Sequence, residues 1–154
     1  MKLSQKHLIL LAAGGSAALM LGALGFQHLG GMAPCKLCIW QRWPHVLAIG
    51  FGAVALIALP RLFSLAGLLA ALTTAALGGY HTGVERGWWQ GPTSCSSSGT
   101  DGISADALFE QIMAAPLVRC DQVPWEMLGL SMASWNMLMS LGLAALWQMA
   151  LRAR

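Results

Sequence analysis

Long apolar stretches alternate with polar segments along the chain, and four of them have nearly the length of a membrane span. A hydrocarbon core about 30 Å thick is crossed by roughly 20 apolar residues in an α-helix. The pattern therefore predicts an all-α membrane protein, a four-transmembrane-helix bundle with two outer loops. The expected spans are 8–26, 44–59, 62–80 and 132–151, and the expected loops are 27–43 and 81–131.

The second stretch is the shortest, and Pro44 stands at its start. A proline is compatible with the first turn of a helix, where its missing N–H has no partner to lose. A helix that began before Cys38 would instead be expected to kink at this proline.

Composition agrees with a membrane chain that forms one domain over residues 1–154. Hydrophobic residues make up 56% of the chain and charged residues 10%, and the mean hydropathy is +0.62. Lys2 and Lys6 precede the first stretch, as in a secretory signal. The stretch is longer than the roughly 7–15 apolar residues of a signal, so we expect a true span.

Charge and tryptophan placement predict the orientation. Four spans put both termini on one side, and basic residues favour the cytoplasm. We therefore expect cytoplasmic termini and both outer loops in the periplasm of a bacterial inner membrane. The terminal side holds five basic residues, Lys2, Lys6, Arg61, Arg152 and Arg154, and the outer side holds four, Lys36, Arg42, Arg86 and Arg119. The tryptophans expected to form an aromatic belt at the outer interface are Trp40, Trp43, Trp88, Trp89, Trp125 and Trp135.

Small residues recur at every fourth position in two of the spans. Gly14, Ala18 and Gly22 form such a stripe in the first, and Ala71, Ala75 and Gly79 in the third. Such stripes allow helix backbones to approach closely in lipid, so both are interpreted as packing surfaces.

The second outer loop is long and polar. Residues 93–102 are rich in Ser and Gly, which predicts mobility around Cys95. Ser104 then offers an N-cap, and a helical apolar stripe follows. This short helix is expected either on the membrane surface or packed on the bundle. Residues 123–129 are also expected to rest at the interface. The members of the stripe are Leu108, Phe109, Ile112 and Met113.

The chemistry of the chain is concentrated in four cysteines. Cys35 and Cys38 form a CxxC motif where a polar turn meets an apolar stretch, and Arg42 follows four residues later. A helix start and a neighbouring cation both favour the thiolate, and Arg42 would lie on the same helical face as Cys38. Cys95 and Cys120 lie in the second outer loop, so all four face the side where disulfides persist.

Other interpretations of the cysteines remain open at this point. The CxxC motif could be half of a zinc site or two buried small residues. A second close cysteine pair, as in ribbon-type zinc sites, is missing from the sequence, which weakens the zinc alternative. The remaining alternative is a non-enzymatic membrane scaffold with two structural disulfides.

Three strings resemble the DsbB family of bacterial disulfide-bond formation membrane proteins. They are FQHLGGMAPCKLCIWQR at 26–42, YHTG at 80–83 and RCDQVPWEMLGLSMASW at 119–135. The resemblance covers nearly the whole chain. The chain departs from the family in its short, Ser/Gly-rich Cys95 loop and in Pro44, close behind the motif.

The resemblance implies an enzyme, a protein-dithiol:quinone oxidoreductase that generates disulfides. A reduced DsbA-type periplasmic oxidant with a thioredoxin fold would attack Cys95 of a Cys95–Cys120 disulfide. Cys120 would then engage Cys35 and release Cys38 as a thiolate beside ubiquinone or menaquinone. A related possibility is a paralogue that serves one dedicated thiol oxidant.

The resemblance also implies roles for two further residues. Arg42 would stabilise the thiolate and the reduced quinone, and His81 would border the quinone pocket or supply a proton. The alternative for His81 is a solvated cap at the interface. The expected partners are the dithiol oxidant, the quinone pool and the lipid bilayer, with no metal and no nucleic acid.

Overall fold

The described part of the chain is a bundle of helices with one small hairpin. The computed structural model describes residues 3–92, 104, 106, 109, 113 and 118–153. Its helices are α1 (Gln5–His28), α2 (Lys36–Ile57), α3 (Pro60–Glu85) and α5 (Met132–Arg152), and its strands are β1 (Glu126–Met127) and β2 (Leu130–Ser131).

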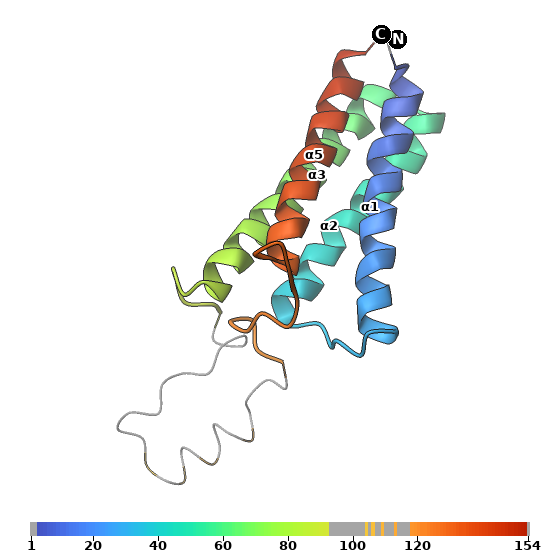
Figure 1. Cartoon of the computed structure of the whole chain (residues 1–154). Helices are drawn as coiled ribbons and strands as arrows, with labels where there is room; N and C mark the ends of the chain where they lie inside the picture. Colours follow the sequence, from blue (N-terminus) through green and yellow to red (C-terminus); the bar gives the residue numbers. More distant parts are fainter. Residues whose placement is uncertain are drawn as a thin grey trace.

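The helices close into a ring in which each packs against two neighbours. α2 and α5 each contact both α1 and α3. Both termini lie at one end of the bundle, together with the connection from α2 to α3, and the hairpin lies at the opposite end (Figure 1). Of the helices in the described residues, α1 and α3 are long and apolar enough to cross a membrane. This finding agrees with the predicted membrane protein. The presence of four spans remains a prediction.

Trp147 of α5 fills the centre of the bundle at the end that holds the termini. Its side chain is fully buried beside Ile9 and Ala12 of α1. A Cβ atom on Gly67 of α3 would lie 2.6 Å from the Trp147 ring, so the indole occupies the space that glycine leaves. Close contact at a small residue is a common way for helices to pack in lipid.

α2 begins earlier than the apolar pattern predicted. It starts at Lys36, and Pro44 is therefore a buried interior residue of the helix and not a residue of its first turn. The proline cannot donate to the carbonyl of Trp40, which loses its intrahelical partner. The early start has a local cause, because Cys35 caps the helix through its sulfur.

α3 extends beyond the expected span 62–80 and includes the first residues of the expected second outer loop. The helix continues to Glu85 and closes with Gly87 at a φ of 68°. The Trp88 N–H donates to the Gly83 carbonyl at 2.9 Å, and the Gly87 N–H to the Val84 carbonyl at 3.1 Å. These two bonds form a Schellman motif, which ends a helix independently of where the membrane ends. His81 therefore belongs to α3 and not to a loop.

The two small-residue stripes differ in what they contact. Ala71 and Ala75 are buried in the bundle, as predicted for α3. The interpretation of the α1 stripe as a helix-packing surface is wrong, because Gly14, Ala18 and Gly22 are exposed. The face that α1 buries holds Leu8, Ile9, Ala12 and Ser16.

Residues after Cys120 form a short hairpin. Glu126 pairs with Ser131 and Met127 with Leu130, and both turn residues, Leu128 and Gly129, have positive φ. Positive φ at both central positions is the signature of a tight type I′ turn. Contact of this segment with the membrane interface remains a prediction. The described residues of the helix expected after Ser104, which are Asp106, Phe109 and Met113, are helical, and Phe109 and Met113 are exposed. The rest of that segment and the environment of Cys95 lie outside the described residues.

Candidate functional site

The CxxC motif forms the N-terminus of α2. Cys35 is the N-cap residue, and its sulfur accepts the backbone N–H of Cys38 at 3.2 Å. The two Sγ atoms lie 2.8 Å apart, with the Cys35 thiol as donor. The N–H groups and positive end of a helix dipole surround the pair, an environment that favours thiolates.

The two sulfurs differ in acidity because they share one hydrogen bond. The bond from the Cys35 thiol lowers the pKa of Cys38 below its ordinary value of 9.0, with a smaller contribution in the same direction from the positive charge of Arg42. The same bond, together with burial, raises the pKa of Cys35. In the reduced pair, Cys38 therefore loses its proton before Cys35 as the pH rises.

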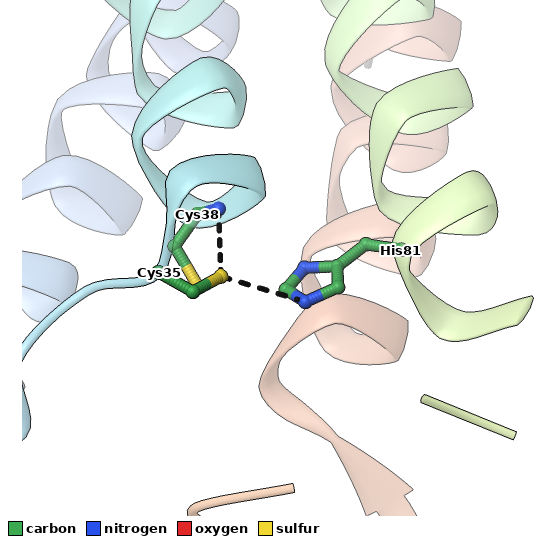
Figure 2. A group of neighbouring side chains, drawn as sticks. All are labelled: Cys35, Cys38 and His81. Atoms are coloured by element: carbon green, nitrogen blue, oxygen red, sulfur yellow. Dashed lines mark hydrogen bonds between the residues drawn. The ribbon is translucent and has the colours of Figure 1, made fainter. Parts of the chain in front are cut away.

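His81 of α3 faces this pair from across the bundle (Figure 2). Its Nε2 atom lies 3.6 Å from Cys35 Sγ and 3.2 Å from the carbonyl oxygen of Cys120. Its Nδ1 atom lies 2.9 Å from the amide nitrogen of Gln41. The residue is 3% exposed, so it is not a solvated cap.

Cys120 lies beside the first cysteine pair. It is fully buried in a cluster with Cys35, Leu37 and Val84. Cys120 is a free cysteine in this structure, as are Cys35 and Cys38. The fold thus brings together three of the four predicted cysteines. Cys95 lies outside the described residues, so its pairing with Cys120 stays a prediction.

A cavity of about 300 Å³ extends from the cysteine pair into the bundle. Cys35, Cys38, Arg42 and His81 contribute to its wall. Much of the remaining wall is apolar, including the exposed small-residue face of α1 at Ala18 and Gly22. An apolar cleft with a few convergent polar groups is the usual form of a small-molecule site.

Arg42 is held at the wall of this cavity by α1. Its Nη1 atom donates to the side-chain oxygen of Gln27 at 2.6 Å. The guanidinium carries five donors, so the contact leaves others for a second acceptor. Arg42 and Cys38 line the same cavity, in agreement with the predicted position of Arg42 near Cys38. The role of Arg42 remains a proposal.

The sequence-based prediction missed two groups of polar residues at the site. Glu85 lies 3.8 Å from His81 Nε2, and its side chain is 4% exposed. The Ser131 hydroxyl donates to the Glu85 carboxylate. The second group consists of Gln41, His45, Thr74 and Asn136, which form a buried hydrogen-bond network. Spacing could have indicated part of it, because Gln41 and His45 follow Cys38 at helical intervals.

One set of side chains in the described residues could hold a metal ion. The ligand atoms of Cys35, Cys38 and His81 all lie within 4.8 Å of one another. Two thiolates and an imidazole are ligands that zinc accepts. Such binding would need both sulfurs reduced, and it would compete with a disulfide between them.

Comparison with known proteins identifies relatives over almost the whole chain. The family model described as Disulfide bond formation protein DsbB matches residues 5–150. A Disulfide bond formation protein B of Stutzerimonas stutzeri is 36% identical over 167 aligned positions, which cover 97% of each chain. Another, of Polaromonas naphthalenivorans, is 32% identical over 158 positions, covering 97% of this chain and 93% of the relative. An uncharacterised protein of Rickettsia prowazekii is 31% identical over 119 positions, covering 75% and 69%.

Proposed function

Because the chain belongs to the DsbB family of disulfide bond formation proteins, we propose that it reoxidises a periplasmic dithiol oxidant of DsbA type and passes the electrons to a membrane quinone. The observation that carries the proposal is that one cysteine pair contacts both a third cysteine and a cavity. The Cys35–Cys38 pair lies next to Cys120, and the same pair lines the apolar cavity.

The first exchange concerns the second loop. A thiolate of the dithiol partner attacks Cys95 of a Cys95–Cys120 disulfide, so a mixed disulfide forms and Cys120 leaves as a thiolate. The second thiol of the partner then resolves the mixed disulfide. The partner leaves oxidised, and Cys95 and Cys120 hold the two electrons.

The second exchange moves these electrons to the first pair. The Cys120 thiolate attacks Cys35 of a Cys35–Cys38 disulfide, and Cys38 leaves as a thiolate. Attack of Cys95 on Cys120 then restores the Cys95–Cys120 disulfide and leaves Cys35 reduced. Burial of Cys120 beside Cys35 supports this order. The lowered pKa of Cys38 supports its role as the leaving group, because a more acidic thiol leaves faster.

The wall of the cavity fits a quinone, either ubiquinone or menaquinone. Its apolar residues suit the ring and tail, and Arg42 offers N–H donors for an oxygen. A bound quinone supplies an acceptor for two electrons and two protons, which re-forms the Cys35–Cys38 disulfide. A DsbA-type oxidant has a reduction potential of about −120 mV, so only a strong acceptor can reoxidise it. In bacteria, electron transfer from DsbA through DsbB to a quinone keeps the periplasm oxidising.

We propose the same orientation that the charge pattern predicted, in a bacterial inner membrane. The termini, at one end of the bundle, would be cytoplasmic, and the cysteine site, at the other, would be periplasmic (Figure 1). The site would then meet the soluble partner at the membrane surface, while the cavity opens to the lipid-soluble quinone.

The test is quinone reduction by the purified chain with a reduced DsbA-type partner, followed separately with ubiquinone and menaquinone. We expect turnover with at least one quinone and none in a Cys38→Ala protein. Thiol trapping without quinone supplies a second readout. Relay cysteines would accumulate reduced, whereas cysteines of a structural scaffold would stay oxidised, and that result would overturn the proposal.

A further inference from the structure

One face of α2 carries a row of functional groups along the cavity. Cys38, Arg42 and His45 stand at positions i, i+4 and i+7, and all three contribute to the cavity wall. With a rise of 1.5 Å per residue, His45 lies about 4.5 Å beyond Arg42 along the helix axis and about 10 Å beyond Cys38. His45 therefore marks the part of the cavity farther from the cysteine pair.

The hydrogen-bond network around His45 has a fixed direction that begins at Gln41. The Gln41 Nε2 atom lies 3.2 Å from the Leu37 carbonyl, which can only accept, so this nitrogen is the donor. The Gln41 side-chain oxygen must then accept, and it receives the Nδ2 group of Asn136 at 2.7 Å. The orientation of the Asn136 amide follows, with its oxygen directed to His45.

This orientation determines which nitrogen of His45 carries the proton. The His45 Nε2 atom lies 2.9 Å from Asn136 Oδ1, an acceptor, so Nε2 donates. The contacts of Thr74 lead to the same assignment of the His45 proton. The Thr74 hydroxyl donates its hydrogen to the Gln41 backbone carbonyl at 3.0 Å, so it can only accept from His45 Nε2, 3.3 Å away. In the neutral ring, Nδ1 is then an acceptor with a free lone pair.

Within the described part of the chain, the Nδ1 atom of His45 has no hydrogen-bond partner, although the residue is only 4% exposed. A buried acceptor without a partner is unfavourable, so such atoms call for a specific explanation. The described residues contain four other buried side-chain atoms of this kind, on Ser16, Ser64, Ser140 and Trp147. None of those four residues contributes to the cavity wall, whereas His45 does.

We propose that His45 Nδ1 accepts a hydrogen bond from an O–H group of the hydroquinone, so that the site holds the reduced ligand more tightly than the oxidised one. This inference rests on the proposed quinone reaction. A quinone oxygen has only lone pairs and cannot satisfy Nδ1, whereas the hydroquinone has O–H donors. A ligand that binds one of two states better shifts the equilibrium toward that state, so His45 favours reduction within the site.

The test measures binding, in the absence of the dithiol partner, to the purified full-length chain in detergent under anaerobic conditions. The probes are decylubiquinone and its hydroquinone, and the readout is equilibrium dialysis. Wild type is expected to bind the hydroquinone more tightly. His45→Leu is expected to weaken hydroquinone binding about two- to tenfold, the range of one net hydrogen bond, and to change quinone binding less than twofold.

Two further variants make the result specific to the acceptor. His45→Gln keeps an acceptor oxygen and is expected to retain most of the preference for the hydroquinone. Ser140→Ala removes an equally buried, unpartnered group of α5 that does not contribute to the cavity wall, and it is expected to leave both affinities unchanged.

Three outcomes would overturn the inference. They are equal binding of the two probes by wild type, an equal loss of both affinities in His45→Leu, and an unchanged preference in that variant. The wild-type comparison is decisive even if His45→Leu does not fold. If wild type reduces quinone with the dithiol partner but shows no preference for the hydroquinone, only this inference fails. If wild type neither binds nor reduces quinone, the proposed function fails as well.

Discussion

The Nε2 atom of His81 lies 3.6 Å from the Sγ atom of Cys35, although the two residues are 46 positions apart in the sequence. Gln41 lies against the other ring nitrogen of His81 and donates to it, so Nε2 carries the proton. This N–H is then directed at the carbonyl of Cys120 and at the sulfur of Cys35. One imidazole therefore joins the two cysteine-bearing segments of the chain.

His81→Leu is expected to slow electron transfer from Cys120 to the Cys35–Cys38 pair about two- to tenfold, because one hydrogen bond that positions Cys120 is lost. Rapid quenching and thiol trapping in a single turnover would measure this step. His28→Leu serves as the control, since His28 is exposed at the end of α1. A single-turnover rate that stays at the wild-type value in His81→Leu would show that this contact is only structural.

Cys38 is expected to react with iodoacetamide at lower pH than Cys35 in the reduced protein. The pKa of Cys38 is lowered, so its thiolate persists below pH 9 and is lost only as the pH falls through the lowered value. The pKa of Cys35 is raised, so its thiolate forms only at higher pH. Mass spectrometry of samples alkylated at a series of pH values would separate the two. Earlier alkylation of Cys35 would contradict the assignment of Cys38 as the thiolate.

Arg42→Met is expected to raise the KM for quinone by one to two powers of ten, since a charge-assisted contact contributes roughly 1.5–3 kcal/mol. Arg42→Lys should recover part of the loss, because it keeps the charge without the planar fork. Steady-state quinone titration gives the values. Mixed-disulfide formation through Cys95 should stay near wild type.

Gln27→Leu provides a matched control for Arg42, because it removes the partner of the guanidinium and keeps the charge. Its effect on the KM for quinone should be smaller than that of Arg42→Met. A defect of Arg42→Met confined to the reaction with the dithiol partner would identify Arg42 as an ordinary interfacial anchor.

Cys95→Ala is expected to abolish the mixed disulfide with the dithiol partner while the Cys35–Cys38 pair still forms. The reason lies in the composition of the sequence, because Cys95, unlike Cys120, stands in a Ser/Gly-rich stretch, which predicts mobility. Non-reducing electrophoresis of the trapped complex would detect the species. A mixed disulfide at wild-type yield in this variant would exclude Cys95 as the point of attack.

Gly67→Val is expected to lower the free energy of unfolding by about 1–3 kcal/mol, because the added atoms overlap the buried ring of Trp147. Reversible denaturation in detergent would measure the change. Gly14→Ala is the control, since a Cβ atom there meets nothing within 4 Å, and no loss is expected. Equal stabilities of the two variants would mean that the helices separate easily at this contact.

Helix ends and faces show where prediction from the sequence fails. Hydropathy places the end of the third span at Tyr80, but the helix continues to Glu85, where the Schellman motif at Gly87 ends it. The stripe of Gly14 and Ala18 has the spacing of a packing surface, yet α1 buries a different face. A lipid-exposed helix is apolar on all sides, so its sequence carries little information about which face is buried.

The four apolar stretches, the CxxC motif at the start of one of them and the resemblance to the DsbB family can be recognised from the amino-acid sequence alone, because apolar length and local motifs are properties of short segments. Which distant side chains meet becomes visible only in the folded chain. The contacts of His81 with Cys35, Arg42 with Gln27 and His45 with Asn136 each join two helices. These contacts depend on how each helix is rotated about its axis and how far it is shifted along its neighbour, and both are set by packing across the whole bundle.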